Sequence, residues 1–165
     1  MPKPLPIAWA GIPAADEVKP MLLIVPAPSE GQVELVLLSR ELVGVWTHWL
    51  HGRTQPCTAP HGCACEGFEI SRRWKGYLGA YLLPAGQIVL AEITWIAANK
   101  ARLGSIERHP GDLRGLTARM RRHRRASGGG CVFEILDRDR YPDARLPGEP
   151  DVRAELQRIW NSKGG

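Results

Sequence analysis

Three of the four cysteines in this chain lie within nine residues, in the stretch PCTAPHGCACEG. These thiols and the nearby histidines could serve as metal ligands: Cys57, Cys63, Cys65, His48, His51 and His61. Zinc prefers four tetrahedral ligands of thiolate and imidazole type, and structural sites often combine a short loop with a residue from a neighbouring element. Glycines and prolines around the cysteines allow the chain to turn tightly. The stretch therefore predicts a zinc site.

The fourth ligand is expected to be a histidine from outside the cysteine loop. His48 ends a predicted strand and would anchor the loop to a sheet, so it is preferred, and His51 and His61 remain alternatives. The predicted ligand set is therefore His48, Cys57, Cys63 and Cys65.

A structural role is favoured for this zinc site over a catalytic one. A catalytic zinc ion keeps an open position for water and needs a carboxylate base, for which Glu66 is the only candidate nearby. No cysteine is marked as a nucleophile by a base and an orienting group of its own. Free thiols or a disulfide are the alternative, although a bridge from Cys63 to Cys65 would be strained.

The terminal and apolar segments predict a cytoplasmic protein without a membrane partner. The N-terminal stretch MPKPLPIAWAGIP lacks the basic start and continuous apolar core of a secretory signal. No apolar run approaches the roughly 18 residues of a membrane-spanning helix. In a cytoplasmic protein, clustered cysteines bind metal more often than they form disulfides.

The positive charge of the chain is concentrated in one segment. The formal net charge is +5, and residues 100–130 carry nine Lys and Arg against two Asp and Glu. Such an asymmetry indicates a surface for a polyanion, with a solvated basic face as the alternative.

A second basic segment, SRRWKGYLGAY, combines cations with aromatic side chains. If it is a strand, alternation places Arg73, Lys75, Tyr77 and Tyr81 on one outward face. Cations that follow a phosphate backbone and aromatics that stack on bases are typical of single-strand binding. The predicted nucleic-acid contacts are Arg72, Arg73, Lys75, Tyr77, Tyr81, Arg119, Arg121, Arg122, Arg124 and Arg125. Four tryptophans are expected in the core: Trp46, Trp49, Trp74 and Trp95.

The elements that would position these residues are mostly strands. Alternating or β-branched patterns predict strands near residues 33–37, 42–50, 73–82 and 88–95, with a turn at Pro84-Ala85-Gly86. A hairpin is favoured over a helix for residues 116–135, and Asp151 is expected to cap a short C-terminal helix. A proline-rich arm (1–30) would precede a single domain (31–165), which is expected to be mainly β, as a small barrel or a sandwich.

The order of these features resembles the zinc-containing OB-fold single-stranded-DNA-binding proteins of tailed phages over roughly residues 32–140. The residues that carry the resemblance are His48, Cys57, Cys63, Cys65 and the segment RRWKGY. The chain differs from that family in its C-x-C spacing, where the family has C-x2-C, and in its mixed-charge C-terminal segment DVRAELQRIWNSKGG, where such proteins often have an acidic tail. The resemblance implies an OB-like barrel with an inserted zinc loop, and binding of single-stranded DNA.

The leading hypothesis is a non-catalytic protein that binds single-stranded nucleic acid, with DNA favoured and RNA as the alternative, and that contains a structural zinc ion. The alternative is an accessory subunit that docks on a larger nucleoprotein or protein complex through its basic segment. Its contacts would then include the proline-rich arm or the C-terminal helix. A metal-dependent nuclease is disfavoured, because the acidic and histidine side chains between Glu107 and His123 lack a convincing arrangement.

Overall fold

The protein was studied as a computed structural model that describes residues 21–58, 63, 65, 71–104, 111–123 and 130–162. Within these residues the chain forms one eight-stranded sheet, two α-helices and a 3₁₀ turn. The strands are β1 (Ile24–Val25), β2 (Gln32–Leu37), β3 (Val43–Leu50), β4 (Arg53–Pro56), β5 (Arg73–Leu83), β6 (Gln87–Thr94), β7 (Thr117–Arg122) and β8 (Cys131–Ile135). The helical elements are α1 (Trp95–Lys100), the 3₁₀ turn η1 (Asp143–Arg145) and α2 (Val152–Ser162). Neither described helix is long and apolar enough to cross a membrane.

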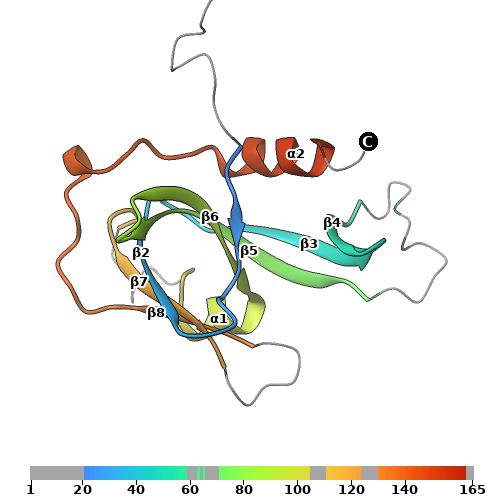
Figure 1. The fold of residues 1–165 in the computed structure, drawn as a ribbon, viewed down its shortest axis with the longest axis horizontal. Coiled ribbons are helices and arrows are strands. Elements are labelled where there is room, and N and C mark those ends of the chain that lie inside the picture. Colours follow the sequence, from blue (N-terminus) through green and yellow to red (C-terminus); the bar gives the residue numbers. More distant parts are fainter. Residues whose placement is uncertain are drawn as a thin grey trace, which may run out of the picture.

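The long strand β5 organises the sheet. One of its edges pairs with β6, while its other edge pairs first with β3 and then with β2. The order β1-β6-β5-β2-β7-β8 follows, with β3 and β4 projecting to one side as a hairpin (Figure 1). The predicted turn at residues 84–86 joins β5 to β6, and the hairpin favoured for residues 116–135 is present as β7 and β8.

The expectation of a mainly β protein with a short C-terminal helix is confirmed, and Asp151 caps that helix through the backbone N–H of Ala154. The sheet is open, however. No ladder joins β8 to β6 among the described residues. One physical reason lies in the predicted arm. Its part from residue 21 onward contains β1, which takes up part of the free edge of β6, with Ile24 opposite Leu90. Residues 1–20 of the arm lie outside the described residues.

Two apolar clusters form the core, one on each face of the sheet. The larger cluster holds aliphatic residues of β2, β5, β6 and β7 together with α1, such as Leu35, Leu78 and Met120. On the opposite face, α2 lies across the sheet (Figure 1) and packs Leu156 and Ile159 against it. The apolar side of α2 has the spacing expected of an amphipathic helix.

A buried arginine ties the chain after β8 to the sheet. The Arg114 side chain is 7% exposed and donates to the carbonyl oxygens of Leu38 (2.9 Å) and Pro147 (2.6 Å). It also forms an ion pair with Asp143, which holds the pKa of that carboxyl below its usual 3.8. Because the folded pKa is depressed, this contribution to stability is present above about pH 4 and is lost on further acidification.

Replacing this guanidinium is expected to destabilise the fold. Arg114→Met keeps the bulk but leaves the buried Leu38 carbonyl and the half-buried Pro147 carbonyl without their donor, at a cost of about 2–4 kcal/mol. Thermal unfolding should shift down by roughly 5–15 °C in a chain of this size. Arg153→Met, at an exposed position of α2, is the matched control and should unfold with the wild type. Equal melting temperatures for the two variants would contradict the assignment.

Candidate metal centre and cationic cleft

A tight hairpin brings the first two predicted metal ligands together. β3 and β4 are joined at His51 and Gly52, both with positive φ (51° and 77°), as in the two-residue turns that match the twist of a hairpin. The ladder ends with the Cys57 N–H donating to the Trp46 carbonyl at 2.8 Å. Cys57 therefore lies opposite Trp46, on the same face of the hairpin as His48. The strand β4 was not predicted from the sequence.

The four predicted ligands lie together. The ligand atoms of His48, Cys57, Cys63 and Cys65 are all within 4.8 Å of one another, so this group could hold a metal ion. His48 Nε2 lies 2.8 Å from Cys63 Sγ, and Cys57 Sγ lies 3.5 Å from Cys65 Sγ. Ligands of a tetrahedral zinc ion lie about 3.6–3.8 Å apart, given bonds of ~2.1–2.3 Å. The group matches a closed four-ligand site after a shift of less than about 1 Å.

The structure bears on two alternatives: a disulfide between the cysteines, and the choice of the histidine ligand. All four cysteines are free thiols, and even the Cys57–Cys65 pair is far beyond a disulfide length of about 2.05 Å. His48 is the histidine of the cluster and is 3% exposed, whereas His51 lies exposed at the hairpin tip. His61 lies outside the described residues. The preference for His48 over His51 agrees with this geometry.

The electrostatics of the cluster favour a cation. The backbone N–H of Cys65 stabilises a thiolate at Cys63 and outweighs burial, so that the pKa of Cys63 falls to about 5. A hydrogen bond with Cys63, together with burial, raises the pKa of Cys65 to about 12. A thiolate therefore forms readily at Cys63, whereas the hydrogen bond and burial disfavour a second thiolate at Cys65. A divalent metal ion reverses that penalty because it stabilises all three thiolates.

A cleft of about 510 Å³ joins the two basic segments of the sequence. Its cations are Arg73 and Lys75 from β5 and Arg122 from the end of β7. Trp74, Trp95 and Ile96 supply apolar lining beside them. We call this the cationic cleft. Arg73 and Arg122 are about fifty positions apart in the chain and lie in the lining of the same cleft, although β2 pairs only with the far end of β5, at residues 80–83.

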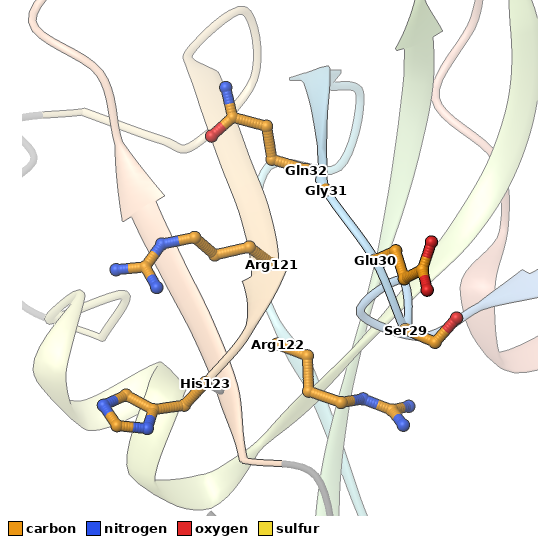
Figure 2. A pocket seen from close by; sticks show the side chains of 7 residues that line it. All are labelled: Ser29, Glu30, Gly31, Gln32, Arg121, Arg122 and His123. Carbon is orange, nitrogen blue, oxygen red and sulfur yellow. The ribbon is translucent and has the colours of Figure 1, made fainter. Parts of the chain in front are cut away.

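A second hollow, of about 1020 Å³, lies where the chain enters β2 (Figure 2). Arg121 and His123 extend to one side of β7, whereas Arg122 extends to the other side, toward the chain near Ser29. Arg122 lines both hollows and donates to the Ala27 carbonyl at 3.3 Å. The two hollows therefore adjoin at this one arginine.

The other predicted nucleic-acid contact residues differ in exposure and in whether they form ion pairs. Arg119 pairs with Glu34 at 3.4 Å, and Lys75 pairs with Glu92 at 2.6 Å. Arg72 is exposed and Tyr81 is half-buried. Arg124 and Arg125 lie outside the described residues. Among the predicted cations whose positions are described, Arg73, Arg121 and Arg122 offer charge to the hollows without an ion pair to an acidic side chain.

Tyr77 was expected to face outward and is instead fully buried. The helix α2 covers its face of β5, where Trp160 packs edge-on against the tyrosine ring with centroids 6.0 Å apart. The hydroxyl donates to Glu92 at 3.0 Å, and burial raises the pKa of Tyr77 well above its usual range. A stacking role for Tyr77 is therefore not compatible with this packing.

Three tryptophans expected in the core are exposed: Trp46 (52%), Trp49 (68%) and Trp95 (59%). Trp74 alone of the four is half-buried against the core. One feature of the sequence could have predicted this exposure. In VGVWTHWL, Trp46 and Trp49 are three residues apart and so project from opposite faces of a strand. A strand with one buried face cannot bury both.

Comparisons with known proteins add no relatives. No protein-family model, curated protein or solved structure matches the chain.

Proposed function

We propose that the protein binds single-stranded nucleic acid without catalysing a reaction, and that a structural zinc ion shapes the edge of its binding surface. The observation that carries the proposal is the cationic cleft, where Arg73 and Arg122 converge from separate segments beside an exposed tryptophan. Cationic side chains next to exposed aromatic rings are the combination with which proteins bind a single-stranded backbone and its bases.

Zinc is the metal proposed for the Cys₃His cluster. Three soft thiolates and one imidazole suit zinc and disfavour magnesium or calcium, which prefer oxygen ligands. Four protein ligands complete a tetrahedron and leave no position for a reactive water. The ion would tie the end of β4 to the cysteine segment and so fix the approach of the chain to β5, which begins at Arg73.

An OB-like architecture is part of the proposal. Its support lies in connectivity: β2 pairs with both β5 and β7, β5 pairs with β6, β7 pairs with β8, and α1 follows β6. β2 and β3 together would correspond to one bent first strand, since both pair with β5 on the same edge. OB-folds are partly open Greek-key barrels whose central strands and adjoining loops bind oligonucleotides.

Salt titration of oligonucleotide binding tests the proposal. We expect binding of oligothymidylate to weaken linearly on a log–log plot, with a slope of about −0.7 for each phosphate neutralised. Three arginines in contact would give a slope near −2 and a loss of about tenfold or more between 50 and 200 mM salt. Affinity that does not change with salt, or no binding at all, would refute the function. Co-purification with an acidic protein would then favour the accessory-subunit alternative.

A further inference from the structure

Three tryptophans come from neighbouring parts of the sheet: two lie on β3 and β5, and the third begins α1 directly after β6. Trp46 on β3 is directly opposite Trp74 on β5. Lys75, the residue after Trp74, is opposite Thr94 at the end of β6, and Trp95 follows Thr94 as the first residue of α1. Neighbouring strands are about 4.8 Å apart, and the three side chains therefore arise from a strip roughly 10 Å wide. We call this strip the tryptophan row.

Two glycines let the middle indole lie across the backbone. A Cβ added at Gly44 would lie 2.6 Å from Cζ2 and Nε1 of Trp74, and one at Gly76 would lie 2.8 Å from Cη2. Gly44 and Gly76 are opposite each other in the β3–β5 ladder. A larger residue at either position would lift the Trp74 ring away from the sheet. Because both glycines lack a side chain, the Trp74 ring lies close to the backbone, between the exposed rings of Trp46 and Trp95.

The two ends of the row are exposed and lie beside cations. Trp46 is 52% exposed, and the Arg72 guanidinium lies over its ring, 5.4 Å from the centroid. Trp95 is 59% exposed at the rim of the cationic cleft, with Arg73 and Arg122 in the same lining. Exposed aromatic rings beside positive charge are the combination that single-strand-binding proteins use for base stacking and phosphate contacts.

We propose that Trp46 and Trp95 are stacking sites for unpaired nucleobases, with Trp74 as the floor between them. This inference rests on the proposed nucleic-acid-binding function and names the residues through which it selects single strands. The faces of bases in a duplex are covered by their neighbours, whereas an unpaired base can stack on an exposed indole. The bound nucleic-acid strand crosses β3, β5 and β6. Arg73 and Arg122 neutralise its phosphates where it passes the cationic cleft.

Alanine variants of the two exposed tryptophans test the stacking sites. Trp46→Ala and Trp95→Ala should each weaken oligothymidylate binding by about 5- to 100-fold. The salt slope should stay at the wild-type value, because no phosphate contact is removed. Trp49→Ala is the matched control. Trp49 is 68% exposed on the same strand as Trp46 but projects from the other face, so its removal should leave the affinity unchanged.

A second readout keeps the test independent of folding defects. Trp46→Phe and Trp95→Phe retain an aromatic face and should restore most of the affinity that the alanine variants lose. Bound oligothymidylate should also protect wild-type tryptophan fluorescence from iodide, whereas a hairpin duplex should protect it much less.

Different results would refute the stacking sites and the proposed nucleic-acid-binding function. Salt-dependent binding that is equally strong in wild type, Trp46→Ala and Trp95→Ala would overturn the stacking sites and leave the nucleic-acid-binding function standing. The same holds for a loss in Trp49→Ala as large as in the other two variants. Absence of any salt-dependent binding by the wild type would overturn both.

Discussion

Removal of the proposed zinc ion is expected to unfold the β3–β4 hairpin and the cysteine segment. Three of the four ligands, Cys57, Cys63 and Cys65, lie at or beyond the end of β4, where the described contacts are few apart from the cluster itself. An ion present at a thousand times its dissociation constant stabilises a fold by about 4 kcal/mol. Chelation should therefore lower the melting temperature by roughly 8–16 °C, as measured by circular dichroism or calorimetry before and after metal removal.

Ligand variants separate this loss from a general effect of the chelator. Cys63→Ala and His48→Ala should bind less than one equivalent of zinc by mass spectrometry and should melt like the chelated wild type. His51→Ala, at the exposed tip of the same hairpin, and Cys131→Ala, at the start of β8, are the matched controls and should retain the metal. Full metal content in His48→Ala together with loss in His51→Ala would contradict the ligand set.

Removal of two cleft arginines is expected to abolish most of the nucleic-acid affinity. Arg73 and Arg122 line the cationic cleft from β5 and β7, and neither pairs with an acidic side chain among the described residues. A hydrogen bond to a charged group contributes about 1.5–3 kcal/mol. The double variant Arg73→Ala/Arg122→Ala should therefore bind oligothymidylate about 10²- to 10⁴-fold more weakly.

The salt dependence tells whether the lost contacts were phosphate contacts. Two neutralised phosphates fewer should reduce the slope of log affinity against log salt by about 1.4. Arg145→Ala removes an exposed arginine of η1, outside the lining of both hollows, and should keep the wild-type affinity and slope. A double variant that binds as tightly as Arg145→Ala would place the binding surface elsewhere.

The local elements and the candidate metal ligands were accessible to sequence reasoning because both depend on short-range pattern. Alternation predicted β2 and the β5–β6 hairpin, and the cap at Asp151 predicted the start of α2. Ligand chemistry is equally local, since thiolates and imidazole identify a soft metal site whatever the fold around them. The short strand β4 was missed because its sequence, RTQP, has neither alternation nor β-branched enrichment.

The sequence by itself determined that this protein is mainly β, that three clustered thiols and nearby histidines could bind a metal ion, and that its positive charge is concentrated in particular segments; the tertiary structure brought His48 to the three thiols. Only the tertiary structure decided which aromatic rings are available. Alternation along β5 separates two faces but does not say what covers them. The helix α2, about seventy-five residues further along the chain, buries Tyr77, whereas nothing among the described residues covers Trp46 or Trp95 to a similar extent. Which aromatic side chains become buried depends on which face of the sheet a distant element covers. The hydrophobic effect is non-directional, so it favours burial of any apolar surface that such an element can reach.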